Sequence, residues 1–97
     1  MEYQIRRYRI AEGKLDEFVD AWKEGVVPLR EQFGFRFHGA WSIAESSEFV
    51  WVISHDGEEG FAAADARYYD SAERKRLSPD PAVHILRGET DAAEQVL

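Results

Sequence analysis

An arginine and a tyrosine near the start of the chain are the first pair of residues that could do chemistry. Arg6 and Tyr8 lie two positions apart in a stretch without helix breakers, residues 3–10, that is typical of a strand. Side chains at this spacing share one face of a sheet. Arg6 could hold a carboxylate or enolate oxygen while Tyr8 donates a hydrogen bond. Equally, Arg6 could pair with a helix glutamate or across a dimer, because a buried arginine needs a partner.

Two histidines form the second candidate pair, provided that their strands pair in one particular register. Residues 35–44 and 49–55 are predicted strands, and the link between them is so short that they must run antiparallel. A four-residue loop over 45–48 would place His38 opposite His55. One face would then carry Arg36, His38, Ala40, Ser42, Trp51, Ile53 and His55, and the other Phe35, Phe37, Trp41, Ile43, Val50 and Val52.

In that register the two imidazoles would flank Trp51 and could transfer a proton. A loop of three or five residues, or a single bulge, would instead put the histidines on opposite faces. We favour structural roles for both, with His55 at the strand end beside Asp56 and His38 hydrogen-bonded in a dimer interface. Two histidines without an inward carboxylate or an HxH spacing do not complete a metal site. The sequence therefore predicts no metal and no cofactor.

Aromatic residues complete the set of candidate ligand-binding side chains. Trp41 and Trp51 could form flat walls of an apolar pocket, although packing is the more frequent role of such residues. Tyr68 and Tyr69 face the sheet from a predicted helix, and the hydroxyl of one of them could extend into the same pocket. The sequence holds no Ser-His-Asp order, phosphate-cradling glycine loop or HExxH, so hydrolase, nucleotide-binding and zinc-protease interpretations have no support. The candidate set is Arg6, Tyr8, His38, Trp41, Trp51, His55 and Tyr69.

Hydrophobic periodicity predicts the elements that position these residues. Residues 49–55 begin with five consecutive apolar side chains, which indicates a strand buried on both faces. Residues 14–33 are predicted as a helix that Gly34 closes. Because Pro28 removes a backbone hydrogen bond, we expect a kink near Gly25 or, less favoured, two shorter helices. The apolar stripe of this helix is Leu15, Phe18, Val19, Trp22, Val26, Leu29 and Phe33, and Arg30 lies largely outside it.

The second half of the chain predicts another helix, a break and a last strand. Asp56 is a suitable N-cap, with Glu59 in the capping-box position. Ser71 is a second capping point, after which the helix restarts over 72–77. A proline-rich break follows, and the last strand must fall within 90–97, although that composition suits a strand poorly. The apolar stripe of the second helix is Phe61, Ala64, Asp65, Tyr68, Tyr69 and Ala72.

The resulting order, β-α-β-β-α-β, predicts an α+β fold of the ferredoxin-like type over residues 1–97 as one domain. In that fold the helices cover one face of a four-stranded antiparallel sheet. Two helices cannot cover both faces, yet the central strand is predicted to be buried on both. We therefore expect a homodimer in which two protomers pair sheet against sheet into an α/β barrel.

Composition excludes several classes of function. The 97 residues include no cysteine, which removes disulfides and thiolate chemistry. The formal net charge of −7 argues against non-specific binding to nucleic acid. The N-terminus has no signal-peptide pattern, and no apolar run approaches the roughly 20 residues of a membrane span. We expect a cytoplasmic protein without a membrane or nucleic-acid partner.

Several short motifs, in this order and spacing, resemble the NIPSNAP family of the dimeric α/β-barrel superfamily. The resemblance extends from Tyr3 to about Pro81 and weakens beyond. It departs from the family at Gln4, where many members have glutamate, so a role for an acidic group there has no support. It implies a ferredoxin-like fold that pairs into a barrel with a cavity. The motifs are Tyr3-Gln4-Ile5-Arg6-Arg7-Tyr8, Gly13-Lys14-Leu15, Val27-Pro28-Leu29, Gly39-Ala40-Trp41, Phe49-Val50-Trp51 and Tyr68-Tyr69 followed by Ser71.

The resemblance implies little about chemistry, because members of the family share no established reaction. Our leading hypothesis is a homodimer that binds a small apolar or aromatic molecule in the barrel cavity. The rival is a cofactor-independent oxygenase or isomerase, in which Arg6 stabilises an oxyanion and His38 or His55 moves the proton. A third hypothesis is a scaffold dimer without a working cavity. The sequence leaves open whether the protein is an enzyme.

Overall fold

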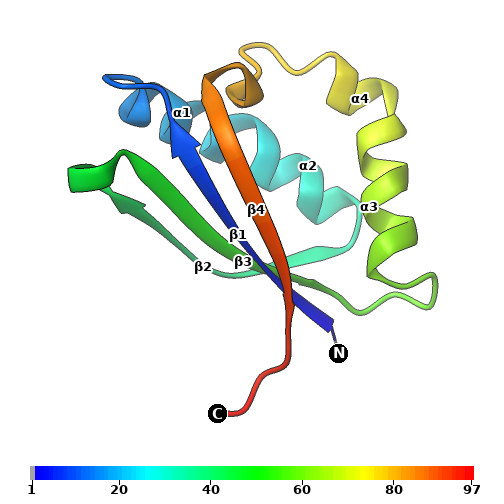
Figure 1. The fold of residues 1–97 in the computed structure, drawn as a ribbon. Coiled ribbons are helices and arrows are strands. Elements are labelled where there is room, and N and C mark those ends of the chain that lie inside the picture. Colours follow the sequence, from blue (N-terminus) through cyan, green and yellow to red (C-terminus); the bar gives the residue numbers. More distant parts are fainter. Residues whose placement is uncertain (1) are drawn as a thin grey trace.

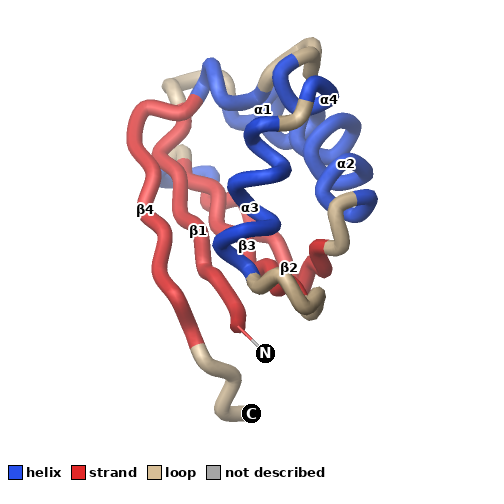
Figure 2. Tube along the Cα trace, turned by 90° about the vertical axis from the view of Figure 1, so that its right-hand side faces the viewer, coloured by secondary structure: helices blue, strands red, loops and turns tan. Residues whose placement is uncertain are grey.

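The fold is a four-stranded antiparallel sheet in the order β2-β3-β1-β4, in a computed structural model that describes residues 2–97. The helices gather on one side of the sheet (Figures 1 and 2). This arrangement confirms the predicted α+β, ferredoxin-like order of elements. Met1, part of the predicted 1–97 domain, lies outside the described residues. The elements are β1 (Glu2–Ile10), α1 (Leu15–Ala21), η1 (Trp22–Val26), α2 (Val27–Gln32), β2 (Phe35–Ile43), η2 (Ala44–Ser46), β3 (Glu48–His55), α3 (Phe61–Asp70), α4 (Ala72–Lys75), η3 (Pro81–His84) and β4 (Ile85–Ala93).

The first helical stretch contains a π turn, η1, at the interruption that the sequence predicted near Gly25. Proline at position 28 has no N–H, so a regular α-helix could not continue its hydrogen bonds there. Instead the N–H of Val27 bonds to the carbonyl of Trp22, five residues earlier. π turns of this kind are frequent at functional sites. Here the turn is followed by Arg30, which is buried.

Trp51, in the centre of β3, lies at the middle of an aromatic core between sheet and helices. Its ring is 5.4 Å from that of Trp22, 5.8 Å from that of Phe37 and 6.2 Å from that of Tyr8, measured between centroids. Burying an aromatic side chain of this size stabilises a fold by about 2–3 kcal/mol. The buried apolar residues packed around it include Ile10, Phe18, Val26, Leu29, Phe35, Phe49, Ile53, Phe61, Ala64 and Tyr68.

A bulge in β2 decides the relation between the two histidines. Between Gly39 and Ile43 the strand pairs with β3 so that Ala40 lies opposite Trp51. The register then shifts at position 38, and Phe37 pairs with Ile53. One extra residue reverses the correspondence of faces. The prediction that His38 lies opposite His55 is therefore wrong.

The second helix begins later than predicted. Asp56 does not cap it: the helix starts at Phe61, and its N-cap residue is Gly60, with a φ angle of 83°. The carboxylate of Asp56 pairs instead with Arg36 at 3.2 Å. The predicted break after Asp70 is confirmed, since the side chain of Ser71 accepts a hydrogen bond from the N–H of Arg74 and caps α4.

The last strand, β4, spans Ile85–Ala93 and not the predicted 90–97. The sequence pattern predicted that Gly88 would interrupt regular structure. Instead, this glycine lies inside the strand, opposite Tyr8. A Cβ at position 88 would lie 3.2 Å from Cδ1 of the Tyr8 ring. Gly88 thus lets the tyrosine ring pack flat across the neighbouring strand.

The sheet face away from the helices is partly apolar and open in the protomer. Val50 and Val52 are half-buried, and Trp41 is 55% exposed. The sequence predicts that β3 is buried on both faces. Within one protomer, only the face toward the helices is fully buried. Among residues 2–97, no helix has both the length and the hydropathy to cross a membrane.

Replacing Gly34 by alanine should lower the free energy of unfolding by about 2–3 kcal/mol. Gly34 follows α2 with a φ angle of 88°, as predicted for a helix-closing residue, and its added Cβ would lie 2.9 Å from Nε2 of His55. Gly13 is the matched control, because it has a φ angle of 77° and no atom within 4 Å of its added Cβ. Gly13→Ala should cost only about 1 kcal/mol. Urea denaturation of both variants measures the difference, and equal losses would contradict the role of the His55 contact.

Candidate functional site

Two arginines share one carboxylate between the sheet and the helices. Arg6 comes from β1, Arg30 from α2 and Asp65 from α3. Oδ1 of Asp65 lies 3.0 Å from Nη2 of Arg6 and 2.7 Å from Nη1 of Arg30. The arginine side chains are 6% and 1% exposed, so both guanidinium groups are nearly removed from water. Such charges are tolerated only with hydrogen-bonded partners.

Neutral oxygens complete the hydrogen bonding of Arg6. The Tyr69 hydroxyl accepts from Nη1 of Arg6 at 3.1 Å and from Nη2 of Arg30 at 3.2 Å. Oε1 of Gln4 accepts from Nε and Nη2 of Arg6 at 3.3 and 3.0 Å. Burial opposes the charge of Arg6, but Tyr69, Tyr8 and Asp65 together outweigh it and raise the pKa of Arg6.

Arg30 is also surrounded by aromatic rings. Its Cζ lies 4.0 Å from the centroid of the Tyr68 ring, 4.6 Å from that of Phe35 and 5.6 Å from that of Trp51. The faces of these rings carry partial negative charge and stabilise a cation. The aromatic core and the ion cluster therefore form one continuous unit.

A cavity of about 90 Å³ lies beside this cluster, under α4 and η3. Burial raises the pKa of the Tyr8 and Tyr68 phenols that line it, so both remain protonated at neutral pH. Its lining residues are Tyr8, Phe18, Trp22, Val26, Arg30, Trp51, Tyr68, Tyr69, Arg74, Pro81, Ala82 and Ile85.

The cavity is the place where buried polar atoms lack protein partners. Among residues 2–97, five buried side-chain nitrogen or oxygen atoms have no hydrogen-bond partner, and all five belong to residues that line it. Buried polar groups are rarely left unpaired in a folded protein, because each costs about 1–3 kcal/mol. The five atoms are Nε1 of Trp22, Nε of Arg30, Nε1 of Trp51, the hydroxyl of Tyr68 and Nε of Arg74.

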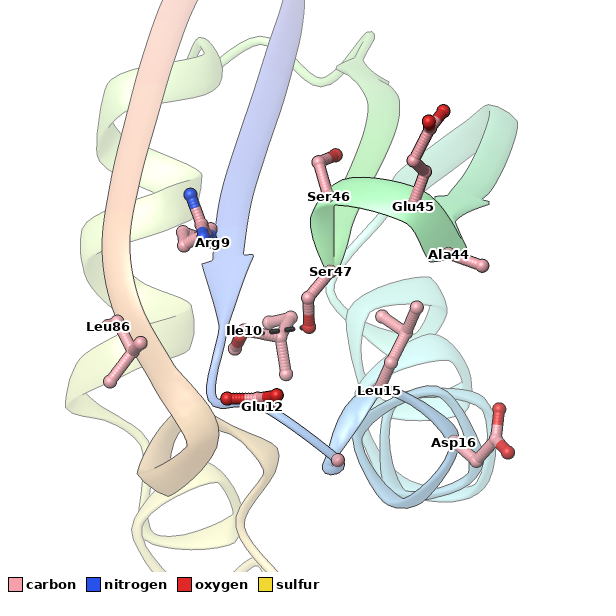
Figure 3. Close-up of a pocket in the computed structure, with 11 residues that line it drawn as sticks. Arg9, Ile10, Glu12, Leu15, Asp16, Ala44, Glu45, Ser46, Ser47 and Leu86 are labelled. Atoms are coloured by element: carbon pink, nitrogen blue, oxygen red, sulfur yellow. Dashed lines mark hydrogen bonds between the residues drawn. The ribbon is translucent and has the colours of Figure 1, made fainter.

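A larger groove, of about 660 Å³, lies where the end of β1 meets the β2–β3 loop (Figure 3). Its charged side chains, which include Arg9, Glu12 and Glu45, are exposed. The hydroxyl of Ser47 donates to the carbonyl of Ile10 across it at 3.0 Å. None of the five unpartnered atoms belongs to this groove, so we take the smaller cavity as the candidate site.

The structure brings together four of the seven sequence-predicted site residues. Arg6 and Tyr69 belong to the ion cluster, and Tyr8, Trp51 and Tyr69 line the cavity. The other three lie elsewhere.

Trp41 and His38 lie on the open face of the sheet, away from the cavity. Nε2 of His38 is 2.7 Å from the hydroxyl of Ser54 on that face. His55 lies on the helix side at the end of β3, where the N–H of Gly57 donates to its Nδ1 and its Nε2 lies 2.9 Å from the carbonyl of Phe33. Both nitrogens of His55 are thus used within the fold.

Arg30, Asp65 and Arg74 belong to the candidate site but were not predicted from the sequence, whereas Tyr68 was considered there together with Tyr69. The role of Asp65 could have been predicted from the sequence, because a carboxylate within an apolar helix stripe requires a buried cation nearby. The burial of Arg30 could not be predicted in this way, because helical periodicity places this residue largely outside the apolar stripe. The cation that neutralises Asp65 is visible only once α2 and α3 are packed on the sheet.

A family model for NIPSNAP matches residues 3–89. This chain belongs to the NIPSNAP family. The similarity thus extends beyond Pro81, the position to which the motifs could be followed. No curated protein matches the chain.

Solved structures share the fold of this NIPSNAP protein. A NIPSNAP domain protein from Burkholderia xenovorans, itself uncharacterized, superposes with a TM-score of 0.84 and 20% identity, covering 99% of this chain and 95% of its own. A NIPSNAP family protein from Agrobacterium tumefaciens gives 0.83 and 17%, covering 96% and 90%. An antibiotic biosynthesis monooxygenase gives 0.69 and 17%, with each chain covered completely. At these identities the similarity shows the fold and not the chemistry.

Replacing Asp65 by asparagine should lower the free energy of unfolding by about 3 kcal/mol. The substitution leaves Arg6 and Arg30 charged and buried without their shared carboxylate. The matched control is Asp70→Asn on the same helix, because Asp70 is 88% exposed in its pair with Lys75. This control should leave the stability almost unchanged. Urea denaturation measures both, and a loss for Asp65→Asn as small as that of the control would contradict a structural role of the cluster.

Proposed function

We propose that this NIPSNAP protein binds a small molecule in the cavity beside Trp51. The observation that carries the proposal is that all five unpartnered buried polar atoms belong to residues that line one cavity. A site meant only for packing would be lined by apolar groups or by polar groups with partners. Aromatic walls with a few convergent polar atoms are typical of ligand sites.

The cavity volume limits what can enter. About 90 Å³ is less than the roughly 150 Å³ of a cavity that holds benzene. A whole aromatic ring therefore does not fit without movement of the wall, and the proposed ligand places only a head group inside. Ala82, in η3, and Tyr69, in α3, line the cavity and are both exposed, so the cavity lies close to the surface at these residues. The remainder of the ligand would extend past η3.

A panel of small acids, amides, alcohols and phenols tests this proposal by tryptophan fluorescence. Trp22 and Trp51 line the cavity, whereas Trp41 is exposed on the other face, so the Trp41→Phe variant removes the background signal. At least one compound should change the emission saturably and raise the melting temperature. If the cavity is the site, Trp51→Phe should remove the contribution of Trp51 to the response and leave that of Trp22, which also lines the cavity. A panel without any saturable response would contradict the proposal.

An oxygenase is the second candidate function, because the fold is shared with an antibiotic biosynthesis monooxygenase. In such a reaction Arg6 or Arg30 would stabilise a developing oxyanion. The proton acceptor that the sequence suggested is not in place, however: His38 lies on the opposite face and His55 is engaged by Phe33 and Gly57. Binding is therefore the better supported function. If the protein consumed dissolved oxygen in the presence of any compound that binds, oxygenase activity would become the better supported function.

We also propose that two copies pair through the open sheet face. This face exposes Trp41 at 55% and Ile5 at 39%, and an apolar sheet surface of this kind favours burial against a partner. Trp41→Asp should convert a dimer into a monomer in sedimentation at micromolar concentration. Val83→Asp is the control, since Val83 is 75% exposed on η3, away from this face. A wild-type monomer would contradict the proposed pairing.

A further inference from the structure

We infer that the head group held in the cavity beside Trp51 is an anion, of the carboxylate class. The inference rests on the proposed function and specifies the chemistry of its ligand. Two independent observations support it: the kind of hydrogen-bonding atom that lacks a partner, and the balance of charge in the cluster.

The unpartnered atoms are almost all donors. The indole nitrogens of Trp22 and Trp51 and the Nε atoms of Arg30 and Arg74 carry N–H groups that can only donate. The fifth atom, the Tyr68 hydroxyl, can donate as well. A group that satisfies these atoms must supply acceptors, and a carboxylate accepts at two oxygens with about four lone-pair sites. A neutral amide or an alcohol brings its own N–H or O–H and matches the cavity less well.

The charges around the cavity are also unbalanced. In the described part of the chain, the guanidinium groups of Arg6 and Arg30 share the single carboxylate of Asp65. Arg74 pairs with Asp80 at 3.2 Å, and this pair joins α4 to η3. Three cations are thus opposed by two carboxylates. One negative charge in the cavity would neutralise the cluster, and it would act in a poorly solvated space where charge interactions are strong.

Two of the guanidinium groups lie against one aromatic ring that lines the cavity. Arg30 and Arg74 both approach the Tyr68 ring, with Cζ at 4.0 and 6.0 Å from its centroid. A volume of about 90 Å³ corresponds to about three water molecules at roughly 30 Å³ each. Acetate, a carboxylate with one methyl group, is small enough for this volume and is therefore a suitable probe. Acetamide has the same number of non-hydrogen atoms and no charge, which makes it the matched control.

The test is a titration of the ¹⁵N-labelled protein with sodium acetate at constant ionic strength, followed through the indole N–H resonances. Acetate should shift the indole resonances of Trp22 and Trp51 saturably, because both residues line the cavity. Trp41, exposed on the opposite face, is the internal reference and should not move. Acetamide should produce no saturable shift.

Variants then assign the effect to the cavity. Arg74→Gln should bind acetate at least about tenfold more weakly, as expected for loss of a charged donor. Tyr68→Phe keeps every charge and should weaken binding less. Arg76→Gln is the control, since Arg76 is exposed two residues from Arg74 and does not line the cavity. It should bind acetate as the wild type does.

Each outcome decides between the two proposals. Equal shifts with acetate and acetamide would overturn the anion inference and leave small-molecule binding intact. No response of Trp22 and Trp51 to acetate would also overturn it, while saturable binding of a neutral compound from the fluorescence panel would preserve the proposed function. Failure of acetate and of the whole panel would overturn both.

Discussion

Two buried arginines that share one aspartate constrain the positions of three elements that are distant in sequence. Arg6 on β1, Arg30 on α2 and Asp65 on α3 meet within hydrogen-bond distance under the helices. A buried guanidinium without a partner is strongly destabilising, so the fold is favoured only when these elements are correctly placed. The aromatic residues around Arg30 follow from the same need, because their rings exclude water while they stabilise the cation.

The same cluster produces the site. Arg30 shares the carboxylate of Asp65 with Arg6, and its Nε has no partner; the indole nitrogens of Trp22 and Trp51 also lack partners, and all three residues line the small cavity. Arg74 of α4, which lines that space, pairs with Asp80, the N-cap residue of η3. The residues that stabilise the core are therefore also the residues that could bind a ligand. Binding of the proposed anion would add to the stability of the fold, because it would relieve a cost that the fold alone carries.

The fold is shared with NIPSNAP proteins and with an antibiotic biosynthesis monooxygenase, but the chemistry must be judged from the site. Arginine and tyrosine donors of this cavity suit an oxyanion. The histidines, which proton transfer would need, are placed elsewhere by the register of β2 and β3. Tyr8 and Tyr68 have pKa values raised by burial and are poor bases at neutral pH. Binding thus has more support in these residues than catalysis does.

Much of this architecture could be predicted from the sequence. The apolar run from Phe49, the amphipathic stripe from Leu15 and the capping serine at position 71 determined the order of elements, because these patterns depend on neighbouring residues alone. Arg6, Tyr8, Trp51 and Tyr69 were predicted as candidate site residues: strand alternation puts Arg6 and Tyr8 on one face, and helix periodicity puts Tyr69 on an apolar stripe. Which face of the first strand looks inward could not be predicted, because both faces are mixed.

Tertiary structure decided the rest. The bulge at His38 separates the histidines, and Gly88 joins β4 because the Tyr8 ring packs against it. The pairing of Arg30 with Asp65 joins two helices that are far apart in sequence. Each of these features depends on which surfaces meet after the helices pack on the sheet. Local patterns determined which elements form, and long-range contacts determined which side chains share the cavity, because a charge finds its partner only in the folded chain.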